Sequence, residues 1–184
     1  MKMNSGALLA VLLGVALAAT ATPLKTDPAK SSVSAVFRQM NVPVESPFKK
    51  FVAQIDYDAA KPELSKASVE IDTASLDVGD ADMNKEVAKK EWFNSAQFPK
   101  ATFVSSAIKP AGPGKLNVAG KLSIKGKSTD VAFPLTVRTE AGKQVFEGAL
   151  PIKRLTYAVG EGEWKDTSMV ADEVVIKFRV TAAK

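Results

Sequence analysis

The feature that most constrains the fold of this chain is a two-residue alternation of apolar and polar side chains. It is clearest in residues 66–73, where Ala67, Val69 and Ile71 alternate with polar neighbours. Successive side chains of a β-strand point to opposite faces of a sheet, so such a stretch has one dry and one wet face. The same pattern recurs at 115–125, 130–138 and 173–181, and more weakly at 33–40, 51–57, 101–108 and 144–153.

These stretches predict about eight antiparallel strands, separated by turns rich in Gly and Pro. The turns lie at 110–114, 125–127 and 141–143. Eight antiparallel strands can close into a barrel or pack as a sandwich of two sheets. The interior of an eight-stranded barrel can be filled by side chains or can hold one small ligand. The alternation does not decide whether the dry faces meet one another or meet a ligand.

Residues 82–91 differ from the rest because they are polar and rich in helix-forming residues. This composition predicts a short surface helix, with an N-cap near Asp80 or Asp82. An aromatic pair, Trp92 and Phe93, follows directly. We expect this aromatic cluster to plug one end of the core.

The N-terminus has the pattern of a signal peptide. Lys2 precedes an apolar run at 6–17, and an Ala-rich tail ends in small residues. The run is too short to span a membrane. We expect cleavage before Thr22, with cleavage after Ala18 as the alternative. The prediction is a signal peptide over 1–21 and one domain over 22–184, beginning with an irregular lead-in.

The chain contains no Cys and no His. The core must therefore hold the fold without disulfides, and imidazole-dependent nucleophiles and the usual zinc and haem sites are excluded. Asp77, Asp80 and Asp82 do not have the spacing of a calcium loop, so we expect a loop and a helix cap there. The formal net charge is +5. Since export makes nucleic acid an unexpected partner, this charge favours solubility or contact with anionic lipid headgroups.

Four stretches carry a likeness to a known family and span nearly the whole chain after the signal peptide. They are 44–58; 69–77 (VEIDTASLD) with 92–103 (WFNSAQFPKATF); 118–135; and 150–160 with 172–176. In this set and order the chain resembles the YceI-like family of exported polyisoprenoid-binding proteins. The resemblance implies an all-β, eight-stranded antiparallel, lipocalin-like barrel with an apolar cavity for an isoprenoid tail.

The same resemblance implies a periplasmic binder or carrier of an isoprenoid lipid or quinone, with neither enzymatic activity nor a cofactor or metal. Some relatives lie beside cytochrome b561-type membrane proteins or are fused to them. A membrane cytochrome is therefore a further expected partner, and a homodimer is compatible with this reading. Two other hypotheses stay open: an accessory module with a filled core and no ligand, and an enzyme that acts on an apolar substrate.

The candidate ligand-binding residues are the large inward-facing side chains and a few groups near a cavity mouth. Alternation alone favours core packing for the apolar ones, whereas the resemblance makes them a cavity wall. The set is Phe37, Phe51, Ile55, Val69, Ile71, Trp92, Phe93, Phe103, Leu122, Phe133, Leu135, Ile152, Arg154, Tyr157, Ile176 and Phe178.

Arg154 is the candidate with two interpretations. A guanidinium can donate two hydrogen bonds to a phosphate or a quinone oxygen. Alternatively, it is structural and bridges a loop to a carboxylate such as Asp72 or Asp77. Nearby, Tyr157 and Trp164 are candidates for capping the barrel mouth.

A second basic group flanks the turn at 125–127. We expect these side chains to be solvated or to contact anionic headgroups. They are Lys121, Lys125 and Lys127, with Lys143 as a further candidate.

Overall fold

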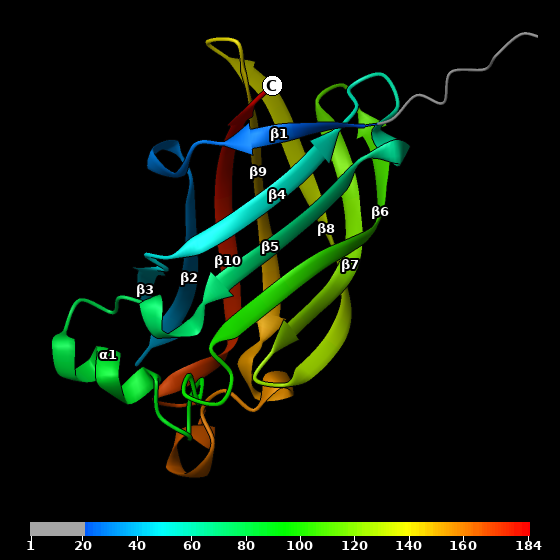
Figure 1. Cartoon of the computed structure of the whole chain (residues 1–184). Coiled ribbons are helices and arrows are strands. Elements are labelled where there is room, and N and C mark those ends of the chain that lie inside the picture. The colour runs from blue at the N-terminus through cyan, green and yellow to red at the C-terminus, as the bar shows by residue number, and fades with distance from the viewer. Residues whose placement is uncertain (1–20) are drawn as a thin grey trace, which may run out of the picture.

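The computed structural model describes residues 21–184 (Figure 1). Its strands are β1 Thr22–Thr26, β2 Ser32–Gln39, β3 Val42–Pro47, β4 Phe51–Tyr57, β5 Lys66–Asp72, β6 Lys100–Gly112, β7 Lys115–Ile124, β8 Lys127–Glu140, β9 Lys143–Lys153 and β10 Val170–Ala183. The helical segments are α1 Ala81–Val87 and the 3₁₀ turns η1 Pro28–Lys30, η2 Pro62–Leu64, η3 Thr73–Ser75, η4 Arg154–Tyr157 and η5 Gly162–Lys165. The expected signal peptide lies outside the described residues, apart from Ala21.

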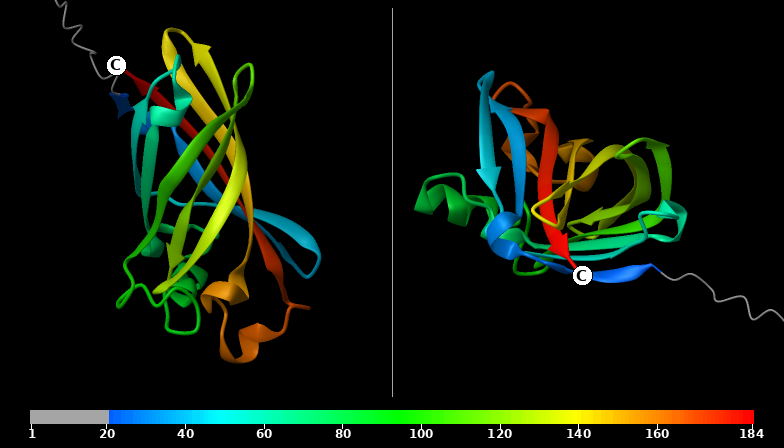
Figure 2. Two further views of the ribbon diagram at one scale, coloured as in Figure 1. Left: turned by 90° about the vertical axis from the view of Figure 1, so that its right-hand side faces the viewer. Right: turned by 90° about the horizontal axis from the view of Figure 1, so that it is seen from above.

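All ten strands belong to one sheet, and β1 closes it into a ring. Strand β1 pairs with β4 through Thr22 to Leu24, and with β10 through Lys25 and Thr26. The ring therefore contains β1 and β4–β10, and the β2–β3 hairpin lies along the rest of the free edge of β10. Seen from above, the hairpin stands to one side of the ring (Figure 2). The predicted all-β, eight-stranded antiparallel barrel with one helix is confirmed.

The eight expected stretches are all strands, but they are not the eight strands of the ring. The expectation of an irregular lead-in over 22–31 is wrong, because β1 lies there and closes the barrel. The strand was missed because two prolines made this segment look irregular: Pro23 lies within β1, and Pro28 begins η1. Leu24 is the apolar residue of β1 that packs against the core, in register with Ile55 of β4.

Strand β3 was not predicted either, because Pro43 and Pro47 argue against a central strand. The β2–β3 turn has positive φ at Met40 and Asn41, as a two-residue type I′ turn requires. The register of that turn makes Pro43, Glu45 and Pro47 non-hydrogen-bonded partners of β2, so their backbone groups face the open edge of β3. Proline has no N–H, so this edge offers another strand very few donors.

Helix α1 is shorter than the predicted 82–91. Its N-cap is Asp80, whose Oδ1 accepts hydrogen bonds from the backbone N–H groups of Asp82 (3.0 Å) and Met83 (2.9 Å). It ends at Val87 because the chain then turns back to bury Trp92, and the N–H of Phe93 donates to the carbonyl of Val87 (3.1 Å). No helix among residues 21–184 has the length and apolar character that crossing a membrane requires.

The barrel has two distinct ends. The loop end, uppermost in Figure 1, carries β1, the C-terminus and the β4–β5, β6–β7 and β8–β9 connections. The helix end carries α1, η4, η5 and the β7–β8 turn. These names are kept below.

A ladder of four charged side chains crosses the outer face of β8, β9 and β10. Arg138 pairs with Glu140 (2.5 Å) and with Glu147, and Arg179 pairs with Glu140 (2.7 Å) and also with Glu147. The hydrogen bonds from Arg138, followed by those from Arg179, lower the pKa of both carboxyl groups below the ordinary 4.5.

We expect this ladder to make the barrel less stable in acid. Because both pKa values are lower in the folded protein, the stabilisation is present above about pH 4.5 and is lost as the pH falls through the folded-state values. Urea unfolding of Glu140→Gln/Glu147→Gln should show a deficit at pH 7 that shrinks towards pH 3. Glu63→Gln, an exposed carboxylate on η2, is the control. A deficit that stays constant with pH would contradict the prediction.

Candidate functional site

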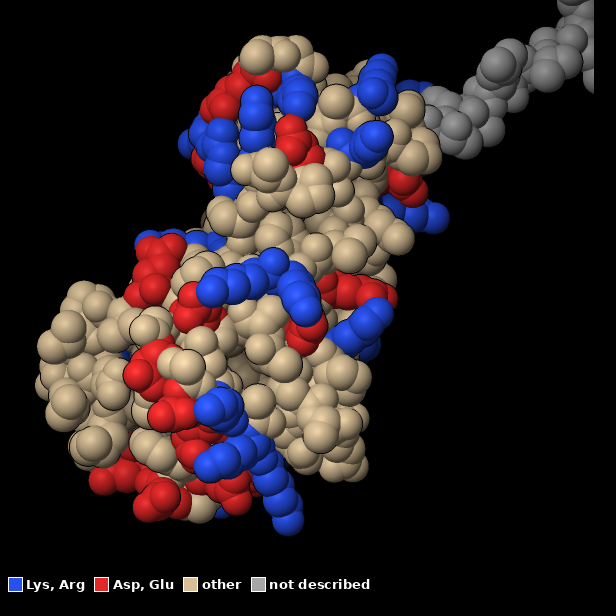
Figure 3. Space-filling model, turned by 60° about the vertical axis from the view of Figure 1, so that its left-hand side comes forward, with Lys and Arg blue, Asp and Glu red and all other residues tan. Residues whose placement is uncertain are grey.

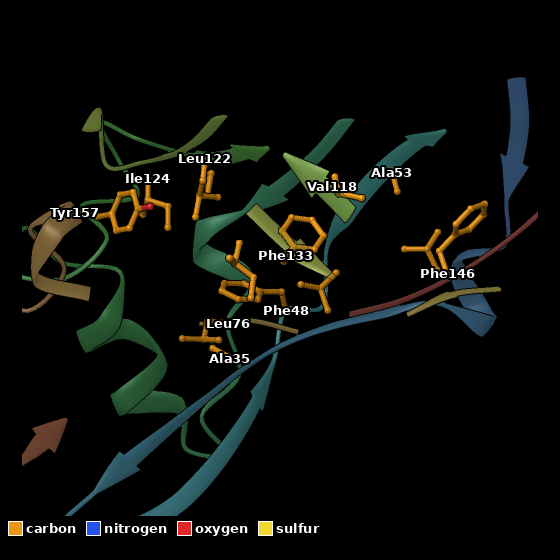
Figure 4. Packing of buried hydrophobic residues seen from close by; sticks show 14 of the residues in the cluster. Ala35, Phe48, Ala53, Leu76, Val118, Leu122, Ile124, Phe133, Phe146 and Tyr157 are labelled. Carbon is orange, nitrogen blue, oxygen red and sulfur yellow. The ribbon is translucent and has the colours of Figure 1, made fainter. Parts of the chain in front are cut away.

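The interior of the barrel contains a cavity of about 170 Å³. It extends from Tyr57 and Phe146 near the loop end to Ile124 and Tyr157 at the helix end. In Figure 4 the labelled lining residues follow this path, from Phe146 past Phe133 to Tyr157, whereas Leu76 belongs to the core outside the cavity wall. The surface that faces the cavity is apolar throughout. An apolar cavity of roughly this size, about 150 Å³ in a well-studied case, stays dry and accepts apolar guests.

Most of the predicted ligand-binding residues line this cavity. They are Ile55, Val69, Ile71, Phe93, Phe103, Leu122, Phe133, Leu135, Ile152, Arg154, Tyr157, Ile176 and Phe178. Their meeting follows from the strand period, because inward positions of neighbouring antiparallel strands lie in register. Val69, for example, pairs with Ala53 on β4 and with Phe103 on β6. Contact with a ligand stays a prediction for each of them.

Phe37, Phe51 and Trp92 were predicted for the same set but lie outside the cavity wall. Phe37 pairs with Val44 and packs against the core, further along β2 than Val33 and Ala35, which do line the cavity. Phe51 is the first residue of β4 and packs against the core. Trp92 packs against Trp164, with the ring centroids 5.2 Å apart and the rings tilted by 50°. Alternation assigns a face to a residue, but it does not say whether that face borders the lumen.

Sequence reasoning missed several lining residues. Small ones such as Ala35, Ala53 and Ala101 gave no signal, because a lone alanine suits either face. Others lie on strand faces that the alternation had already identified and could have been included. The further lining residues are Val33, Phe48, Tyr57, Ser65, Ala67, Thr102, Ile108, Leu116, Val118, Ile124, Phe146, Leu150, Val159, Val174 and Val180.

Polar residues of the wall direct their polar atoms elsewhere. The Ser65 hydroxyl accepts a hydrogen bond from the backbone N–H of Asp58 (3.0 Å). The Tyr157 hydroxyl pairs with that of Thr129. Burial, followed by the charge of Asp58, raises the pKa of Tyr57 above its ordinary value, so its hydroxyl stays neutral. These residues therefore present carbon atoms to the cavity.

Arg154 is buried, with 3% of its surface exposed, and its guanidinium donates only to backbone carbonyls. The acceptors are the carbonyls of Val159 (2.9 Å), Gly160 (3.2 Å), Trp164 (2.6 Å), Val170 (2.8 Å) and Ala171 (3.1 Å). The five N–H donors of a guanidinium can make no more such bonds than these five. Desolvation lowers the pKa of Arg154, and nearby Asp172 opposes the shift. This geometry indicates a structural role, in which the guanidinium of Arg154 holds residues 154–171 together; we call this arrangement the Arg154 clamp. Neither Asp72 nor Asp77 is its partner.

Two neighbours complete this clamp. Gly160 has a φ of +85°, and a Cβ at this position would overlap the guanidinium, so only glycine fits. The guanidinium also lies over the Trp92 ring, with Cζ 5.6 Å from its centroid, within the range of a cation–π contact. Trp164 packs on Trp92 and supplies one of the carbonyls. The predicted cap of Tyr157 and Trp164 therefore lies at the helix end.

A row of three phenylalanines crosses the middle of the wall. Phe133 on β8 contacts Phe103 on β6 and Phe178 on β10, with ring centroids 5.4 and 5.5 Å apart. Gly120 and Gly148 lie on the intervening strands β7 and β9. A Cβ on Gly120 would lie 2.6 Å from Cε2 of Phe103, and one on Gly148 would overlap Phe178. Because glycine has no side chain, the rings of Phe103 and Phe178 can lie against the wall at Gly120 and Gly148, which leaves room in the lumen.

The lysines predicted near the 125–127 turn behave differently from one another. Lys125 is buried, and its Nζ donates to the carbonyls of Lys90 and Ala158 (both 2.7 Å) and to Glu161 (2.9 Å). It is therefore neither solvated nor available to a headgroup. Lys121 pairs with Asp130 (2.9 Å), and Lys143 lies at the loop end, paired with Asp27 (2.8 Å).

The acidic group after β5 caps backbone and side-chain donors. Asp77 accepts hydrogen bonds from the backbone N–H of Gly79 and the Asn84 amide (both 3.0 Å) and pairs with Lys49 (2.6 Å). These contacts, led by the one with Lys49, hold the pKa of Asp77 well below its ordinary value. Within residues 21–184 no three potential metal ligands gather in one place.

The chain is similar to a known protein family, to curated protein sequences and to solved structures. A family model described as the YceI-like domain matches residues 24–182. A UPF0312 protein of Pseudomonas savastanoi pv. phaseolicola is 35% identical over 105 residues, which cover 57% of this chain and 54% of that protein. One from Pseudomonas fluorescens is 37% identical over the same length. The chain thus spans about half the length of these curated relatives.

Among solved structures, BcnA of Burkholderia cenocepacia is 56% identical, with a TM-score of 0.84 over 86% of this chain and all of that one. A polyisoprenoid binding domain from Saccharophagus degradans has a TM-score of 0.68 at 18% identity, covering 89% of this chain and 98% of its own. That second likeness shows the fold alone.

Proposed function

The chain belongs to the YceI-like domain family, and from this membership and the dry cavity we propose that it binds a long apolar lipid inside its barrel. The ligand we propose is an isoprenoid tail, as in a polyisoprenoid or an isoprenoid quinone. The protein would act as a periplasmic binder or carrier.

The observation that carries this proposal is the apolar cavity that runs from Tyr57 to Tyr157. Its polar residues turn their donors and acceptors towards the protein, so a ligand meets carbon on every side. Burial of apolar surface contributes about 25 cal/mol per Å², and a long hydrocarbon tail has much of it to bury. An elongated lumen with the phenylalanine row in its wall suits an extended chain better than a compact ligand.

The relatives support the chemical class of the ligand. The Saccharophagus degradans domain, which shares the fold, is described as polyisoprenoid binding. A methyl-branched tail matches a wall built from Val, Ile, Leu and Phe side chains. Because the likeness is one of fold, the assignment to this chain rests on its own cavity.

Binding rather than catalysis suits the wall composition. Among residues 21–184, the titratable side chains at the cavity are Arg154, Tyr57 and Tyr157, and no carboxylate or lysine lines it. Arg154 is occupied by five carbonyls. General acid–base catalysis needs a titratable group within hydrogen-bond reach of the substrate. Of the two tyrosines, Tyr157 pairs with Thr129, and the raised pKa of Tyr57 disfavours its ionised form.

The test is to purify the protein from its exporting cell, determine its N-terminus by mass spectrometry, extract it with organic solvent and identify what is released. We expect a start at Thr22 and a stoichiometric isoprenoid lipid. If no lipid is recovered and none binds on reconstitution, the accessory-module alternative replaces this proposal. Recovery from the periplasmic fraction checks the location separately.

A further inference from the structure

Six exposed lysines surround the loop end without a carboxylate partner among the described residues. They are Lys25, Lys30, Lys61, Lys66, Lys109 and Lys115. They are distant in sequence, but the antiparallel order brings β1, the starts of β5 and β7 and the end of β6 to one end of the ring. Figure 3 shows several blue side chains at this upper end, with red ones among them.

Several carboxylates at the loop end already pair with a cation, so they cancel little of this charge. Asp27 pairs with Lys143 (2.8 Å), and both glutamates of the β8–β10 ladder pair with arginines. One oxygen of Asp58 accepts hydrogen bonds from the backbone N–H groups of Ala60 (2.8 Å) and Lys61 (3.0 Å). Among the described residues, the carboxylates without a cation at this end are Asp56, Asp58, Glu63 and the C-terminal one of Lys184, which is offset by the exposed ammonium of Lys184 itself.

The helix end is different, because its lysines are matched by carboxylates. Among the described residues Lys50, Lys127 and Lys153 lack an ion pair there, but so do Glu91, Glu163 and Glu173. Several other lysines of this end pair directly with carboxylates. Examples are Lys49 with Asp77 (2.6 Å), Lys85 with Asp82 (2.9 Å) and Lys121 with Asp130 (2.9 Å). Figure 3 shows red and blue mixed at the lower end. The positive charge of the chain is therefore concentrated at one end of the barrel, although the sequence shows only a mild overall excess.

Two apolar groups lie among the lysines of the loop end. Leu64, on η2, is 39% exposed. Tyr57, the last residue of β4, is half-buried and lines the cavity, with its ring 5.2 Å from that of Phe146. An apolar body with a polar tip suits the boundary between water and lipid. The loop end thus combines unpaired cations, an exposed leucine and one end of the cavity.

We propose that the loop end docks on an anionic lipid surface, with the cavity end at Tyr57 turned towards the membrane. Each lysine near such a surface strengthens binding to anionic headgroups, and apolar side chains that enter the headgroup region add to this. The proposal goes beyond ligand binding, since docking requires neither an occupied cavity nor a particular ligand.

The test is cosedimentation with vesicles of mixed phosphatidylglycerol and phosphatidylcholine, compared with pure phosphatidylcholine. The wild-type protein should bind the anionic vesicles only, and the binding should fall steeply with salt, as screening predicts. The variant Lys66→Gln/Lys109→Gln/Lys115→Gln should bind at least about tenfold more weakly. Leu64→Gln should weaken binding by less. Equal binding to both kinds of vesicle would overturn the proposal.

A matched variant at the opposite end separates docking from net charge. Lys50→Gln/Lys127→Gln/Lys153→Gln removes three exposed lysines of the helix end that lack ion pairs, and it should bind like the wild type. An equal loss in both triple variants would mean that net charge alone acts. A loss in Met40→Gln/Val42→Gln, at the exposed tip of the β2–β3 hairpin, would place the contact there instead. Lipid extraction from each variant reports ligand binding separately, so the two proposals can fail independently.

Discussion

Replacing Arg154 with Met is expected to lower the free energy of unfolding by about 3–5 kcal/mol, the cost of removing one partner from a buried charged network. Met keeps much of the length of the side chain and removes all five donors. The carbonyls of Val159, Gly160, Trp164, Val170 and Ala171 would then be left without this donor in a largely buried region, and each unsatisfied buried group costs about 1–3 kcal/mol. Urea unfolding followed by tryptophan fluorescence measures the loss.

The neighbouring residue supplies the control for this prediction. Lys153 is exposed, so Lys153→Met should change stability by less than about 0.5 kcal/mol. Arg154→Lys should fall between the wild type and Arg154→Met, because an ammonium keeps the charge but offers fewer donors in another geometry. If Arg154→Met has wild-type stability and loses only its bound lipid, the guanidinium acts on the ligand and the clamp interpretation is wrong.

Replacing Val69 with Trp is expected to abolish lipid retention while leaving the barrel folded. Val69 faces the cavity between Ala53 of β4 and Phe103 of β6. A tryptophan side chain there would fill much of the 170 Å³ lumen. Overpacking a filled core costs about 1–3 kcal/mol, and an existing void lessens this strain. Lipid per protein, measured by extraction and mass spectrometry, should fall at least about tenfold, which corresponds to about 1.4 kcal/mol of binding free energy.

The matched control for this change is Val104→Trp. Val104 lies on β6, next to Phe103, but it faces outwards and is 56% exposed. The same substitution on the outer face should leave both the bound lipid and the far-ultraviolet circular dichroism unchanged. If Val69→Trp retains its lipid, the cavity is not the binding site.

The strands could be predicted from the sequence because each carries its own local signal. The period of two in residues such as Val69 and Ile71 is fixed by backbone geometry, and all eight expected strands are present. Strands β1 and β3 were missed because Pro23, Pro43 and Pro47 are poor central-strand residues. Edge positions and a short closing strand tolerate them, but sequence does not reveal which positions are edges.

The site could be predicted only in part, because a hollow interior and a filled one share the same alternation. The family resemblance supplied the cavity, and most of the predicted residues line it. A structural role for Arg154 was one of two interpretations, but the partners of Arg154 and Lys125 could not be predicted, since they are backbone carbonyls that only the folded loops bring near. The concentration of lysines at one end likewise needs the strand order, since no run in the sequence contains it.

The cavity also has a mechanical consequence. Unfolding eliminates internal voids, and the resulting decrease in volume means that hydrostatic pressure favours the unfolded state. A barrel with an empty lumen is therefore expected to unfold at a lower pressure than the same barrel with a lipid in it. The phenylalanine row, backed by Gly120 and Gly148, holds that volume open. The pressure at which the barrel unfolds is thus a physical measure of whether its lumen holds a lipid.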